Sequence, residues 1–248
     1  MWSSFSKHRK LFFAIGVPLW VFLGFMLAQA VVIVILELFA LVGVTFEGAN
    51  SAVINAVVAG VIYALSLLIV IGVPWLVKKR VTTKQEVGLQ RLPVWLDLLW
   101  APAGAIVYII LTSLITAAAM AFLPFIDFEQ VQDTGFNAIS QQHEYVLAFI
   151  MLVVVAPVAE EILFRGYLFG KLRKYAPLWA AIGVTSLVFA IVHFAWNVGL
   201  DVFALSTVLC LLRVVSGSLW PSILLHMMKN GIAFYFLFIN PTILSTLG

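Results

Sequence analysis

The chain has 248 residues, of which 64% are hydrophobic and only 10% are charged, with a mean hydropathy of +1.13 and a net charge of +3. Soluble globular domains carry roughly 45–50% apolar and about 25% charged residues, so the composition excludes a soluble protein and indicates an integral membrane protein. The single Cys210 excludes an intrachain disulfide and a cysteine-based metal site.

The apolar segments are long and continuous, which is typical of transmembrane helices and not of β-barrels, whose strands show short alternating patterns. We therefore predict an all-α fold, a polytopic transmembrane helix bundle of about seven to eight spans in one domain over residues 1–248. The seven runs cover residues 11–41, 52–77, 94–123, 145–170, 178–198, 200–215 and 219–239. An eighth span is open if the first run or the polar stretch 124–144 hides a break.

The first run follows Lys7, Arg9 and Lys10, an arrangement similar to that of a signal peptide. It is much longer than an h-region of 7–15 residues and lacks a clear small-x-small cleavage site, so we predict a retained first helix.

Basic residues are distributed unevenly along these spans. They occur at the N-terminus, in 78–91, in 171–174 and at Arg213, whereas the alternate loops 42–51, 124–144 and 198–201 contain none. Cytoplasmic loops carry an excess of Lys and Arg, so the pattern predicts a cytoplasmic N-terminus and an external C-terminus. The expected location is a bacterial plasma membrane.

The fourth run contains two adjacent carboxylates and an arginine. Charged groups at membrane depth cost at least ~2.5–3.5 kcal/mol each on insertion scales and are usually functional. In a helix, Glu161 and Arg165 lie four positions apart on one face and can pair. Glu160 is rotated by about 100° from Glu161, so the spacing predicts a structural ion pair and a separate carboxylate that is available for chemistry.

The later spans carry further polar residues inside apolar runs. His193 lies within the fifth run, and His226 and Asn230 lie four positions apart on one helical face of the seventh. A carboxylate, two imidazoles and an amide are sufficient for hydrolysis, because the carboxylate can take a proton from water and the others can polarise it or donate to an oxyanion. Lys229, beside this face, can pair with Asp201 or a glutamate, or extend to the membrane surface.

Three motifs occur in order: Glu-Glu-x-x-x-Arg-Gly at 160–166, Phe-x-x-x-His ending at His193, and His-x-x-x-Asn from His226 to Asn230. Together they resemble the signature of the CPBP family, which groups type II CAAX prenyl endopeptidases with Abi and bacteriocin-processing membrane proteases. The resemblance covers about residues 145–235, which would form the catalytic core. It implies a membrane-embedded endopeptidase whose active site opens toward the cytoplasm.

The resemblance also implies roles for individual residues. Glu160 would activate water, His193 would help to position it, and His226 with Asn230 would stabilise the oxyanion. Glu161 and Arg165 would support the site, so the candidate catalytic set is Glu160, Glu161, His193, His226 and Asn230, with Arg165 in a supporting role.

The sequence leaves a metal cofactor open. The family is described both as metalloproteases and as glutamate proteases; in the metal version, zinc would be bound by His193, His226 and Glu160. The chain lacks the His-Glu-x-x-His pattern, which places two metal ligands one turn apart.

The expected partners are membrane lipid and a peptide or membrane-anchored protein substrate, with no nucleic acid; the oligomeric state is open. The candidate physiological functions are CAAX-type processing and, in a host without prenylation, bacteriocin maturation or immunity. The alternative is a non-catalytic membrane protein of the same fold, either a scaffold or a proton or cation relay.

Overall fold

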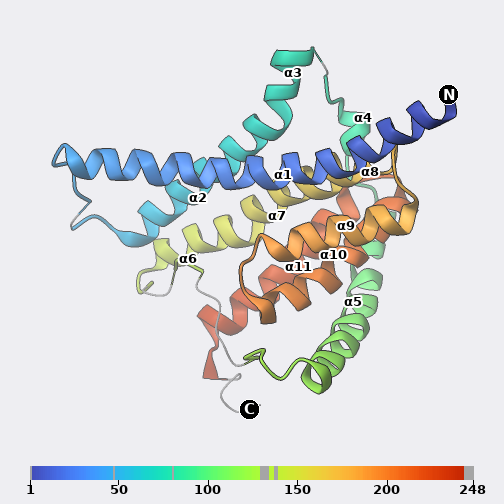
Figure 1. The fold of residues 1–248 in the computed structure, drawn as a ribbon. Helices are drawn as coiled ribbons and strands as arrows, with labels where there is room; N and C mark the ends of the chain where they lie inside the picture. The colour runs from blue at the N-terminus through green and yellow to red at the C-terminus, as the bar shows by residue number, and fades with distance from the viewer. Residues whose placement is uncertain (1, 47, 80, 129–133, 137–138, 243–248) are drawn as a thin grey trace.

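The computed structural model describes the whole chain except residues 1, 47, 80, 129–133, 137–138 and 243–248. Within the described residues every regular element is a helix, which confirms the predicted all-α bundle (Figure 1). The elements are α1 (Trp2–Leu41), α2 (Ser51–Leu67), the π-helix η1 (Leu68–Gly72), α3 (Val73–Lys78), α4 (Lys84–Val87), α5 (Trp95–Phe122), α6 (Gln142–Phe149), the π-helix η2 (Ile150–Val155), α7 (Ala156–Glu161), the π-helix η3 (Ile162–Leu168), α8 (Phe169–Leu172), α9 (Leu178–Ile191), α10 (Trp196–Ser216), α11 (Trp220–Phe234) and the π-helix η4 (Tyr235–Ile239).

The continuous helical segment Gln142–Leu172, from α6 to α8, lies at the centre of the bundle. α1 extends along one side of the molecule and contacts η3, α8 and α9, while α5 packs against α10 and α11 (Figure 1). α7, which carries both glutamates, contacts α2 and α11. Because helices surround this segment, the side chains of Leu163, Phe164 and Leu168 are fully buried.

Six of the seven predicted runs form helical segments that are long and apolar enough to cross a membrane, counted over the described residues. The fifth run forms only α9, which has 14 residues and is ~21 Å long, shorter than the ~30 Å hydrocarbon core of a bilayer.

The predicted end of the fifth run, residue 198, is wrong. α9 ends at Ile191, and Phe194 follows with a left-handed backbone (φ 54°). In this turn the ring of His193 binds the carbonyl oxygen of Phe189, which lies four positions earlier in the last turn of α9. Consequently His193 lies in the turn between α9 and α10, not in mid-helix, and α10 begins at Trp196, earlier than residue 200.

The central segment is not a uniform α-helix. Two π-helical stretches, η2 and η3, flank the six residues of α7 that carry the glutamates. In η2 the N–H of Ala156 donates to the carbonyl of Met151, five positions earlier. The next carbonyl, that of Leu152, would need an N–H from Pro157, which has none. The π-helical register therefore leaves the Leu152 carbonyl without a backbone partner inside the segment.

Candidate active site

Glu160 lies at the edge of a cavity of about 380 Å³ between α2, α7 and α11. Its Oε1 accepts a hydrogen bond from the hydroxyl of Tyr63 on α2, at 2.6 Å. The Glu160 side chain is 13% exposed, so the carboxylate is oriented by the protein and yet accessible from the cavity.

Glu161 and Arg165 form the predicted ion pair one turn apart, with 2.7 Å between Oε1 and Nη1. Both side chains are fully buried. The guanidinium of Arg165 lies 4.2 Å from the centroid of the Phe189 ring, a cation–π contact that ties this pair to α9. The predicted ion pair between Glu161 and Arg165 is therefore confirmed.

His226 of α11 lies between the two carboxylates. Its Nδ1 is 3.0 Å from Oε1 of Glu161, and its Nε2 is 3.7 Å from Oε2 of Glu160. Because an ionised carboxylate can only accept a hydrogen bond, Nδ1 carries the proton directed at Glu161. Glu161 thus orients the imidazole so that its other nitrogen faces Glu160.

His193 is oriented in a similar way by backbone. Its Nδ1 lies 2.7 Å from the carbonyl oxygen of Phe189, and a carbonyl only accepts, so Nδ1 is the protonated nitrogen. In the neutral imidazole the lone pair is then on Nε2. His193 lines the same cavity as Glu160 and His226.

Asn230, one turn after His226, also lines this cavity. Its Nδ2 donates to the carbonyl of Leu152 at 2.8 Å. In a regular α-helix, Pro157 would leave the Val153 carbonyl without its backbone donor; the π-helix η2 shifts the unpaired carbonyl by one residue, to Leu152. The amide of Asn230 has two N–H groups, so one binds Leu152 and one is available to another acceptor.

The structure therefore brings Glu160, His193, His226 and Asn230 from three separate segments around one cavity. Lys229 lines it too, and its Nζ lies 3.3 Å from Oδ2 of Asp201, which was one of the alternatives for this lysine. Asp201 also accepts hydrogen bonds from Tyr108, at 2.5 Å, and Thr112, at 2.9 Å. The lysine is thus compensated by an anchored carboxylate.

The residues expected to bind zinc do not group as a metal site. Glu160 and His226 approach each other, but within the described parts of the chain no three His, Cys, Asp or Glu side chains are arranged to hold a metal ion. A catalytic zinc site ordinarily has three protein ligands.

Tyr63 is the contact that the sequence interpretation missed. It lies inside the second apolar run, and its hydroxyl reaches Glu160 across 97 positions. A buried phenol needs a hydrogen-bond partner, so a tyrosine within a membrane span was a usable signal, although it could not name the partner.

The fold and the site define a polytopic helical membrane protein in which two glutamates, two histidines and an asparagine meet in one buried region. Residues 142–232 match the family model described as "Type II CAAX prenyl endopeptidase Rce1-like". The segment with all three motifs thus matches an Rce1-like domain, which confirms the resemblance; the match supports a CAAX-type intramembrane protease at the level of the family. Comparisons with curated proteins and with solved structures gave no match.

Proposed function

We propose that the protein is an endopeptidase that hydrolyses a peptide bond in a membrane-associated peptide or protein, with Glu160 as the base that activates water. The observation that carries the proposal is the position of the Glu160 carboxylate: Tyr63 orients one oxygen, and the other faces His226 and the cavity. A base in a cavity, with its proton-accepting atom oriented, is the first requirement for general base catalysis.

Two acceptors are available to a water molecule in this cavity. The Glu160 carboxylate accepts one of its protons, and the lone pair on Nε2 of His193 accepts a hydrogen bond from the other. The water oxygen then attacks the scissile carbonyl carbon while its proton moves to Glu160. When the tetrahedral intermediate collapses, protonated Glu160 returns the proton to the leaving amine.

The oxyanion of that intermediate needs donors. A proton on Nε2 of His226, in addition to the one on Nδ1, supplies one donor. The second N–H of Asn230 supplies another donor. Removing one oxyanion donor typically costs about 10²–10³ in kcat.

The test is cleavage of a prenylated peptide with a C-terminal CAAX sequence, which is the probe that the family suggests. Glu160→Gln keeps the shape and an acceptor for Tyr63 but removes the base, so cleavage is expected to be lost while the purified protein retains its melting temperature. Wild-type turnover in the Glu160→Gln protein would disprove the mechanism. The same peptide without the prenyl group and an amphipathic bacteriocin-like peptide define the substrate class.

The matched control is Glu144→Gln. Glu144 lies at the start of the same helical segment and binds Asn50 at 2.5 Å, outside the cavity lining. It is expected to keep cleavage activity. A proton flux in liposomes that is lost in Glu160→Gln, with no cleavage of any of the peptides, would instead support a relay.

A further inference from the structure

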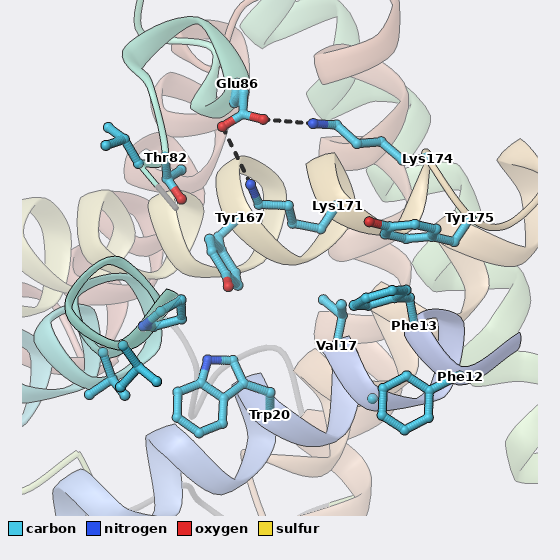
Figure 2. Close-up of a pocket in the computed structure, with 15 residues that line it drawn as sticks. Phe12, Phe13, Val17, Trp20, Thr82, Glu86, Tyr167, Lys171, Lys174 and Tyr175 are labelled. Atoms are coloured by element: carbon cyan, nitrogen blue, oxygen red, sulfur yellow. Dashed lines mark hydrogen bonds and ion pairs between the residues drawn. The ribbon is translucent and has the colours of Figure 1, made fainter. Parts of the chain in front are cut away.

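A second and larger cavity, of about 610 Å³, lies apart from Glu160. It is lined by α1, by α3 and the segment that leads from it into α4, and by the end of the central segment from η3 onward (Figure 2). Its lining side chains are mostly apolar, and among the described residues its charged ones come from Glu86, Lys171 and Lys174. None of these residues takes part in the proposed hydrolysis.

Aromatic rings form much of the apolar lining. Phe13 stacks on Tyr175 with 4.8 Å between ring centroids, and Trp20 lies farther along α1 (Figure 2). The indole Nε1 of Trp20 donates to the carbonyl of Val70 at 3.0 Å, so its polar atom is satisfied and its ring adds apolar surface. A region of this kind suits a hydrocarbon chain.

The charged residues gather on the opposite side of the cavity (Figure 2). Glu86 binds Lys174 at 2.6 Å and Lys171 at 3.3 Å. Two lysines against one glutamate leave one net positive charge. Each ammonium has three N–H donors, of which Glu86 takes one, so both lysines can also bind a further anion.

We propose that this cavity binds one anionic phospholipid, with an acyl chain along Phe13 and Trp20 and its phosphate against Lys171 and Lys174. Three observations select this occupant. The cavity lies between helices long enough to cross a membrane, where lipid is the solvent; it is apolar at one side; and it is basic at the other. Basic pockets between transmembrane helices on the cytoplasmic side bind acidic lipid headgroups.

The cavity adjoins the segment that carries the glutamates. A Cβ placed on Gly166 would come within 2.5 Å of Val87, which shows how closely α4 packs on η3. A lipid phosphate bound to Lys171 of α8 would therefore lie at the end of the helical segment whose α7 turn holds Glu160. We expect the lipid to stabilise this packing and to raise the melting temperature of the protein.

The test uses delipidated full-length protein in detergent and native mass spectrometry, with phosphatidylglycerol and phosphatidylcholine of identical acyl chains. Gly16 lines the cavity, and a Cβ there meets no heavy atom within 4 Å, so Gly16→Phe fills the cavity without a clash at the backbone. Gly183→Phe on α9 is the matched control, because its Cβ also meets open space and it does not line the cavity.

The second pair of variants tests the charge. Lys174→Met removes a half-exposed lysine of the cavity, and Lys84→Met removes an exposed lysine of the same region outside the lining. We expect Lys174→Met to weaken phosphatidylglycerol binding about fivefold, as one lysine near an anionic headgroup is worth about 1 kcal/mol. Lys84→Met is expected to change it less than twofold.

The expected result is one tightly bound phosphatidylglycerol, weaker phosphatidylcholine, loss of the bound lipid in Gly16→Phe and retention in Gly183→Phe. Equal binding of the two lipids, or equal effects of Lys174→Met and Lys84→Met, would overturn the proposal. If Gly16→Phe does not fold, the lysine pair decides alone. Because the readout is lipid binding, the result does not depend on peptidase activity.

Discussion

The carboxylate of Glu161 accepts a hydrogen bond from Nδ1 of His226 at 3.0 Å, across 65 positions of the sequence. The same oxygen pairs with Arg165 at 2.7 Å. The contact joins α7 to α11 and directs the second nitrogen of the ring at Glu160. Glu161 thus orients the His226 ring toward Glu160, and its ion pair with Arg165 belongs to the architecture of the candidate site.

Arg165→Met is expected to destabilise the protein strongly. It removes the guanidinium that pairs with the fully buried Glu161 carboxylate, and breaking a buried pair by removing one partner costs about 3–5 kcal/mol. The measurement is unfolding in SDS. Arg173→Met, an exposed arginine at the end of the same segment, should stay within about 0.5 kcal/mol of wild type.

The double variant Glu161→Gln with Arg165→Met separates charge from packing. The double variant contains neither charge of the pair, so no buried ion is left unpaired. It is therefore expected to unfold at a higher SDS concentration than Arg165→Met alone. If the double variant unfolds at a lower SDS concentration, the loss of stability in Arg165→Met comes from the lost contact with Phe189 and the lost side-chain volume, not from the buried charge.

Tyr63→Phe is expected to lower kcat by about 10–100-fold, with KM changed less than about twofold. The phenol orients one oxygen of Glu160, and a misplaced catalytic group can cost 10²-fold. Steady-state cleavage of the prenylated peptide measures both constants. Tyr108→Phe is the control, since its hydroxyl binds Asp201. An unchanged kcat in Tyr63→Phe would show that the orientation of Glu160 does not depend on Tyr63.

Cleavage is expected to continue in the presence of a chelator. The described residues present no group of three ligands, and a catalytic zinc site ordinarily has three. The measurement is zinc content per chain by elemental analysis, together with activity after dialysis against EDTA and after zinc is restored. Stoichiometric zinc, with activity that falls on chelation and returns with the metal, would contradict the route through side chains alone.

Stability is expected to depend on acid pH through Glu86 of α4. The hydrogen bond from Lys174 lowers the pKa of Glu86 from its usual value of 4.5 to about 2. A depressed pKa contributes stability above pH 4.5, and this contribution is lost as the pH falls toward 2. The group is partly exposed, so screening reduces the contribution to about 1 kcal/mol.

Glu86→Gln tests this directly. The variant should be less stable than wild type at pH 7, and the difference between the two proteins should disappear between pH 4.5 and about 2. Thermal unfolding of both proteins across that range is the measurement. A constant difference at every pH would mean that the side chain acts through packing and not through its charge.

The motif residues and their local pairing could be predicted from the sequence. Helical spacing alone placed Glu161 and Arg165 on one face, and the apolar runs predicted six of the long helical segments. Both inferences depend on residues within a few positions of each other, or on composition, and neither needs knowledge of how the helices pack.

The tertiary structure decided the rest, because the remaining contacts join distant segments. It selected Tyr63 as the partner of Glu160, moved His193 out of α9 into a turn, and shifted the unpaired carbonyl from Val153 to Leu152, where Asn230 binds it. Each of these depends on competition between side-chain and backbone hydrogen bonds in a packed apolar interior. Composition and helical spacing determined which groups needed partners, and only the packing of the helices determined which partners they found.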